Sequence, residues 1–110
     1  MKEKIEIDGV TYRAVLEVSE TVLIRTYSAG VHFGTLSKRS GDEITLTQAR
    51  RLHRWSGAAS LSQVAIDGVD LANSRISVFV PEITILGVIE IIPMSTKASK
   101  QMLEAESWKN

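Results

Sequence analysis

The sequence contains no cysteine, two prolines and few aromatic side chains, which make up 5% of its 110 residues. The absence of cysteine excludes disulfides, zinc–thiolate sites, iron–sulfur clusters and thiol nucleophiles, and it fits a reducing cytoplasm. No apolar stretch follows the charged start Met1-Lys2-Glu3-Lys4, so no signal peptide is recognised. The longest near-apolar stretch, residues 83–92, is shorter than the roughly 20 residues that span a membrane. We therefore expect a cytoplasmic protein with no membrane segment and no disulfides.

A net charge is also absent, because 13 basic residues balance 13 acidic ones. A neutral chain lacks the wide positive surface of a general nucleic-acid binder. The charges are not evenly distributed along the chain, however, since residues 25–54 hold six lysines and arginines but only two acidic residues. The hydrophobic content of 44% and the charged content of 24% are ordinary for a globular protein, and the length predicts one domain, residues 1–110.

The first half of the chain alternates between apolar and polar residues, which is typical of β-strands with one buried face. Asp8-Gly9 predicts a tight hairpin turn, because both central positions of a type I′ turn need a positive φ. Breaks at Ser28-Ala29-Gly30 and at Ser40-Gly41-Asp42 predict two further turns. The predicted strands cover residues 3–8, 10–18, 21–27, 31–36 and 43–46. In succession they predict an N-terminal antiparallel β-meander.

The pattern changes to a helical spacing after residue 46. Ala49, Leu52 and Trp55 follow one another at intervals of three residues. Thr47 precedes them as a candidate N-cap, and Gly57 follows as a candidate C-terminal residue in the left-handed conformation. These signals predict a helix between residues 47 and 56.

Two more helices are predicted, one from Ser60 to Asp67-Gly68 and one over residues 97–106, for which Ser95 or Thr96 is the candidate N-cap. Residues 75–80 predict a strand, whereas residues 83–92 fit either a helix or a strand. The predicted fold class is therefore α+β, with an N-terminal antiparallel β-meander followed by short helices and a further strand.

Established catalytic motifs are missing, including HExxH, GxSxG, the P-loop and GxGxxG. His32 could act as a base for Ser28, but no carboxylate stands at a recognisable spacing to orient it. The run from Asp67 to Asp70 resembles a calcium loop, yet its twelfth position is Val78 and not the required glutamate. We therefore expect no enzymatic activity, no metal site and no cofactor.

The basic residues Arg50, Arg51, His53 and Arg54 crowd the predicted helix, where positions 50, 53 and 54 would share one face. A solvated face paired with carboxylates elsewhere explains such a cluster. An anionic partner explains it too, because planar guanidinium forks suit bidentate contacts with phosphate.

Two runs of small residues, 28–30 and 56–60, would let a ligand approach the backbone closely at Ser28 and Ser60. Tight packing between elements or subunits explains these runs as well. Tyr27 and Phe79 lie close in sequence to an arginine, and we regard them as candidates to stack on a nucleobase.

Four unusual strings follow one another in the chain: RTYSAGVHFG at 25–34, ARRL at 49–52, WSGAASLSQ at 55–63 and EIIP at 90–93. Over about residues 20–96 they resemble a family of small phage and prophage proteins. This family is similar to the first Thoeris anti-defence family, phage proteins that sequester a host immune signal. The chain departs from that pattern at His53 or Arg54, where an aromatic residue is expected. It departs again at Ile76, where relatives often carry phenylalanine, so Phe79 would have to stack on the base instead.

The resemblance implies an α+β homo-oligomer, a dimer or larger, in the cytoplasm of the bacterial host. It would bind a cyclic ADP-ribose isomer (glycocyclic ADP-ribose made by bacterial TIR-domain enzymes) or another cyclic nucleotide, without degrading it. A ligand with a pyrophosphate, a purine and two riboses requires guanidinium forks and a slot for the base. The candidate nucleotide-binding residues are Arg25, Tyr27, Ser28, Arg50, Arg51, Arg54, Ser60 and Phe79.

Two other functions stay open. The first is a small phage protein that binds nucleic acid or a host protein through the Arg50–Arg54 helix. The second is an enzyme that cleaves such a nucleotide with His32 as its base.

Overall fold

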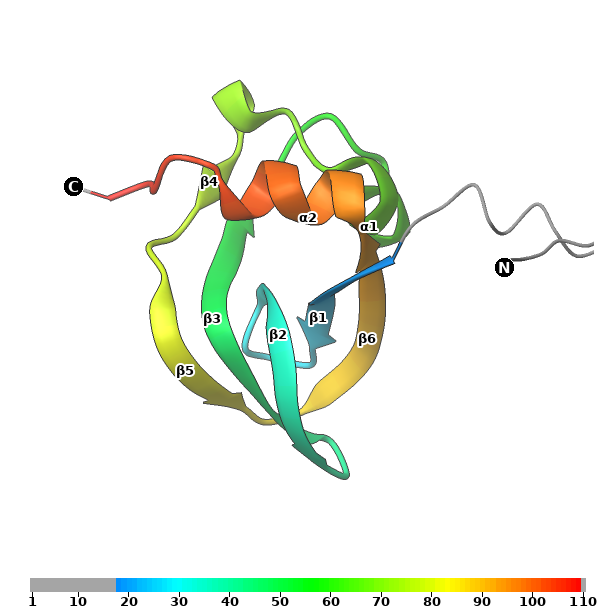
Figure 1. Cartoon of the computed structure of the whole chain (residues 1–110). Helices are drawn as coiled ribbons and strands as arrows, with labels where there is room; N and C mark the ends of the chain where they lie inside the picture. The colour runs from blue at the N-terminus through cyan, green and yellow to red at the C-terminus, as the bar shows by residue number, and fades with distance from the viewer. Residues whose placement is uncertain (1–17, 110) are drawn as a thin grey trace, which may run out of the picture.

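A computed structural model describes residues 18–109, in which six strands form one sheet and two helices lie against it (Figure 1). The α+β class predicted from the sequence is confirmed. The predicted strand at 3–8 and nearly all of that at 10–18 lie outside the described residues. The strands are β1 Val18–Thr26, β2 Val31–Ser40, β3 Glu43–Arg54, β4 Arg75–Ile76, β5 Val80–Ile85 and β6 Val88–Ser95. The helices are α1 Leu61–Asp67 and α2 Thr96–Leu103, and a 3-10 turn covers Leu71–Asn73.

The sheet is antiparallel, with the order β4-β3-β2-β1-β6. Strand β5 pairs with the first half of β3, and β4 pairs with its second half. The meander β1-β2-β3 is confirmed, and so are its turns, where Gly30 and Gly41 have φ values of 86° and 61°. Gly87, with a φ of 71°, separates β5 from β6. Residues 83–92 are therefore two strands joined by a turn.

The helix predicted between residues 47 and 56 is wrong, because strand β3 continues through this segment to Arg54 and pairs with β2 along its length. Its apparent helical spacing has another cause. Ala49 and Leu52 are both buried, but in different clusters on opposite faces of the sheet, as an odd spacing in a strand requires. Gln48, with a φ of 49°, interrupts the regular register between β2 and β3 and disturbs the alternation that marks a strand.

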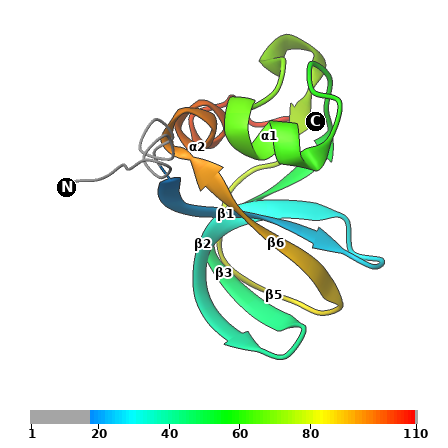
Figure 2. The same cartoon turned by 90° about the vertical axis from the view of Figure 1, so that its right-hand side faces the viewer.

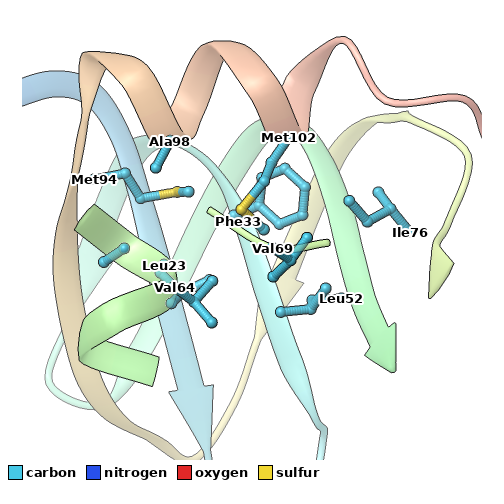
Figure 3. Packing of buried hydrophobic residues seen from close by; sticks show 10 residues of the cluster. Leu23, Phe33, Leu52, Val64, Val69, Ile76, Met94, Ala98 and Met102 are labelled. Atoms are coloured by element: carbon cyan, nitrogen blue, oxygen red, sulfur yellow. The ribbon is translucent and has the colours of Figure 1, made fainter. Parts of the chain in front are cut away.

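The sheet curls, and each of its faces buries an apolar cluster. One cluster lies between the sheet and the two helices, where Leu23 and Phe33 meet Val64 of α1 and Met102 of α2 (Figure 3). The second cluster lies on the other face, between the curled strands away from the helices (Figure 2). Its buried members are Val22, Ile24, Ile44, Leu46, Ala49 and Ile85.

Serine side chains cap both helices, as the sequence predicts for their N-termini. The Ser60 hydroxyl accepts a hydrogen bond from the Gln63 N–H at 3.1 Å, and the Ser95 hydroxyl accepts one from the Ala98 N–H at 3.0 Å. The Gln63 side chain reaches back to the Ala59 N–H, which completes a capping arrangement around α1. Helix α2 begins at Thr96, one residue before the predicted start, and ends at Leu103, three residues before the predicted end.

Within residues 18–109, the largest fully buried side chain is that of Arg50 in β3, which is only 1% exposed. Burial lowers the pKa of this guanidinium, and no carboxylate within residues 18–109 forms a salt bridge with it. Backbone carbonyls and one hydroxyl compensate the charge instead. The acceptors are the Ser77 carbonyl at 2.8 Å, the carbonyls of Met102, Leu103 and Ala105 at 3.0, 3.1 and 2.7 Å, and the Ser107 hydroxyl at 3.0 Å.

Arg50 therefore joins the end of helix α2 to the middle of the sheet. The carbonyls at a helix C-terminus carry the negative end of the helix dipole, which favours a cation there. The ring of Phe79 lies 4.4 Å from the guanidinium carbon and adds a cation–π contact. One side chain thus holds β3, the segment before β5 and the chain after α2 together.

Arg50→Ala is expected to lower the free energy of unfolding by about 3 kcal/mol or more, because several buried acceptors lose their donor at once. Arg51→Ala is the matched control, because Arg51 is the next residue in β3, its side chain is exposed, and the substitution removes the same charge. Chemical denaturation of both variants measures the difference. Equal stability of the two variants would show that the contacts of Arg50 contribute nothing to folding.

Candidate functional site

Arg51 lies at a pocket of about 270 Å³ on the face of the sheet away from the helices. The pocket is lined by His32, Ala49, Arg50, Arg51, Ser77, Val78, Val80 and Ile83. Its wall is apolar except for the histidine, the serine and the two arginines, and Arg50 is already enclosed by its own acceptors. None of the described residues that line it is acidic. The pocket therefore combines one accessible guanidinium with an apolar wall.

His32 forms the polar floor of this pocket and is only 2% exposed. Its Nε2 lies 2.8 Å from the Ala29 carbonyl oxygen and 3.5 Å from Nη2 of Arg51. A carbonyl oxygen only accepts, so Nε2 must carry the proton and donate to Ala29. The same nitrogen cannot then accept from Arg51, whose guanidinium is near the imidazole without being hydrogen-bonded to it.

Burial lowers the pKa of His32, which favours the neutral imidazole in the folded protein. The hydrogen bond to the Ala29 carbonyl raises the pKa in part, and the charge of Arg51 lowers it further. The sequence suggested His32 as a base for Ser28, but its side chain is buried. Ser28 is exposed in the turn before β2, and within residues 18–109 no hydrogen bond joins it to His32.

The turn between β1 and β2 lies beside the Arg51 side chain. A Cβ atom placed on Gly30 would lie 3.9 Å from Nε of Arg51, so the backbone of the turn approaches the guanidinium closely. The Thr26 hydroxyl holds the turn in place, because it donates to the Gly30 carbonyl and accepts from the Ala29 N–H. The small-residue run at 28–30 is thus brought to the rim of the Arg51 pocket.

Arg25 and Tyr27 do not join this pocket. Arg25 pairs in register with Val31, which in turn pairs with Leu52, so its side chain leaves the sheet on the face opposite to Arg51. Its Nε donates to Glu90 at 2.7 Å in a half-exposed salt bridge. The Tyr27 side chain is 86% exposed.

Three more candidates have structural contacts. Arg50 uses its donors inside the protein, and Phe79 packs on that guanidinium on the helix side of the sheet. Ser60 caps helix α1. We therefore leave Arg50, Phe79 and Ser60 out of the ligand-binding set.

Arg54 lies at a second, wider hollow of about 720 Å³ at the end of β3. It stands directly opposite Arg75 of β4 in the register of the sheet. The remaining lining residues are Trp55, Ser56, Ala72, Asn73, Ser74 and Trp108. No local pattern in the sequence places Arg75 beside Arg54, because that contact depends on the pairing of β3 with β4. We call this hollow the Arg54–Arg75 groove.

Residues 18–109 contain no group of three or more histidine and acidic side chains that could hold a metal ion. None of their helices is long and apolar enough to cross a membrane.

Comparison with known proteins gives one match. A family model described as a domain of unknown function, DUF6948, matches residues 19–102, which is more than half of the chain. Neither the curated proteins nor the solved structures contain a match. The matched range covers both hollows except for Trp108.

Because His32 is buried, we expect the free energy of unfolding to decrease on acidification at pH values above those at which carboxylates titrate. The pKa of His32 is below the ordinary value of 6.5 in the folded state, so the unfolded chain binds the proton first. The stability from the neutral imidazole is complete above about pH 6.5 and is lost as the pH falls toward the lower folded value. Denaturant unfolding between about pH 7.5 and about pH 5.5 measures this slope.

His32→Gln should flatten that slope. His53→Gln, which changes the exposed second histidine of the chain, is the control and should retain it. A His32→Gln variant with the wild-type slope would contradict the assignment.

Proposed function

This chain belongs to the DUF6948 family, a domain of unknown function, and we propose that it binds a cyclic nucleotide signal and sequesters it without cleaving it. The ligand class is a cyclic ADP-ribose isomer, such as glycocyclic ADP-ribose, or a cyclic oligonucleotide. In this proposal the protein is a phage or prophage anti-defence protein in the cytoplasm of a bacterial host. Sequestration then lowers the concentration of a host immune signal by mass action.

The observation that carries the proposal is the Arg51 guanidinium at the mouth of a largely apolar pocket. Within residues 18–109, no salt bridge involves Arg51. Its fork can bind a phosphate with two parallel N–H donors. The apolar wall, with Val80 and Ile83, can cover a ribose or the face of a base. One pocket thus offers both kinds of contact that a nucleotide needs.

The turn at residues 28–30, which lies beside the Arg51 side chain, also supports a nucleotide site at this pocket. Gly30 keeps the backbone close to the guanidinium without a side chain in between. Ser28 is exposed in this turn and can contact a ribose or phosphate oxygen. We therefore assign Arg51 and Ser28, with His32 behind them, as the ligand-binding set.

The alternative function, binding of nucleic acid or a host protein through a basic helix, loses its geometric basis. Residues 50–54 form a strand, in which Arg50 and Arg51 point to opposite faces of the sheet. Arg50 is buried, so the cluster presents no continuous basic face.

Calorimetric titration with cyclic ADP-ribose isomers tests the proposal. Arg51→Ala is expected to weaken binding about tenfold or more, since a charged hydrogen bond to phosphate is lost. Arg39→Ala is the matched control, because Arg39 is exposed in β2 and bonds the Gly41 carbonyl of its own hairpin. Equal loss in both variants, or no binding to any isomer, would contradict the proposal.

Recovery of the nucleotide after heat denaturation of the complex separates sequestration from catalysis. We expect the ligand to be recovered intact. A cleaved product would favour the enzyme hypothesis with His32 as base.

We expect the protein to form a dimer or larger oligomer. The Arg51 pocket, at about 270 Å³, is slightly smaller than the roughly 300–1,000 Å³ of sites that enclose small ligands, so a second copy would have to complete the wall. Light scattering measures the mass with and without ligand. A monomeric mass in both states would contradict this expectation.

A further inference from the structure

The Arg54–Arg75 groove is separate from the Arg51 pocket. The two share no lining residue, and Arg51 follows Arg50 in β3 whereas Arg54 ends the strand. We propose that this groove is a second ligand site, which binds the diphosphate group of a nucleoside diphosphate. The inference does not depend on the proposed function of the Arg51 pocket.

The first argument is the placement of two like charges. Arg54 and Arg75 are direct partners across the antiparallel pair β3 and β4. Directly opposed residues have Cβ atoms about 5 Å apart, and like charges at such positions destabilise a sheet. An anion bound between the two guanidinium groups relieves this repulsion. Because the forks start so close together, both can reach one phosphate or two linked phosphates.

The second argument is the absence of acidic neighbours among the residues that line the groove. Within residues 18–109, neither Arg54 nor Arg75 takes part in a salt bridge. Asp70, at the start of the nearby 3-10 turn, accepts hydrogen bonds from the Ala72 N–H and from Nδ2 of Asn73. The Asp70 carboxylate therefore binds donors within its own 3-10 turn.

The third argument concerns the accessibility of the Arg75 donors. The guanidinium carbon of Arg75 lies 5.1 Å from the centre of the Trp108 ring. A cation–π contact does not neutralise the guanidinium charge, so its N–H groups can still donate to an anion. The His53 ring stacks on Trp108 with centroids 5.0 Å apart, which fixes the indole at the groove. Arg75 is thus oriented without being neutralised.

The size and walls of the groove favour a nucleotide over a bare anion. Its volume of about 720 Å³ exceeds what a diphosphate group fills and lies in the range of small-molecule sites. Trp55 and Trp108 provide aromatic surface, and Ser56, Asn73 and Ser74 provide polar groups along the wall. A base and a ribose can occupy this part while the phosphates lie at the arginines.

Intrinsic fluorescence gives a selective readout, because the chain has two tryptophans and both line this groove, whereas neither lines the Arg51 pocket. The wild-type protein is titrated separately with ADP, inorganic pyrophosphate and adenosine. We expect ADP to change the tryptophan emission saturably, pyrophosphate to bind more weakly and adenosine not to bind. No saturable change with ADP would overturn the proposal. Binding of pyrophosphate as tight as that of ADP would overturn the assignment of a nucleotide.

Variants locate the effect. Arg54→Gln and Arg75→Gln are each expected to weaken ADP binding about tenfold or more. Arg39→Gln, with the same loss of charge in the β2–β3 hairpin, should leave it unchanged. Since Arg75→Gln also removes the contact with Trp108, calorimetry replaces fluorescence for this variant, and Arg54→Gln keeps that contact intact. Equal weakening of ADP binding by Arg39→Gln would show that the effect comes from the general loss of positive charge, and it would overturn the proposed site.

Discussion

The fold depends on the buried positive charge of Arg50, which forms no salt bridge with a carboxylate within residues 18–109. Taking a guanidinium out of water is costly, and the cost is offset only when its donors find well-placed acceptors. Here the acceptors are carbonyls from the end of α2, from the chain after it and from Ser77, so Arg50 can be satisfied only when these segments are all in place. Packing of α2 and the path of residues 103–107 are thereby coupled to β3.

This coupling extends to the outer surface. The Ser107 hydroxyl accepts a hydrogen bond from Arg50, and the next residue is Trp108. The backbone N–H of Trp108 donates to the carbonyl of Ile76 in β4. The indole then stacks on His53 and contacts Arg75. One wall of the Arg54–Arg75 groove therefore depends on Arg50, the buried side chain that binds the last carbonyls of helix α2. Arg50 also lines the Arg51 pocket, so a change of this residue would disturb both hollows.

The sequence predicted those elements whose signals are local. Turns at Gly30 and Gly41 follow from the conformational freedom of glycine, and Ser60 and Ser95 begin helices because their hydroxyls satisfy nearby N–H groups. The helix predicted after Thr47 was wrong, since both faces of β3 are buried there and buried residues of different faces then lie three residues apart, as in a helix. Arg75 stayed unrecognised as a partner of Arg54 for a different reason. Their pairing is a long-range property of the sheet, and neither residue carries a local sign of it.

Strand geometry also decides what the basic segment can do. The surplus of positive charge in residues 25–54 appears uniform in the sequence, but the fold gives its arginines different environments. Backbone carbonyls compensate Arg50, and Glu90 pairs with Arg25. Arg51 and Arg54 lie at two separate hollows, each without an acidic lining residue among those described. Electrostatic attraction for an anion is strongest where a guanidinium is neither neutralised nor fully surrounded by water. By that criterion the two hollows are the proposed phosphate sites within residues 18–109 of this overall neutral protein.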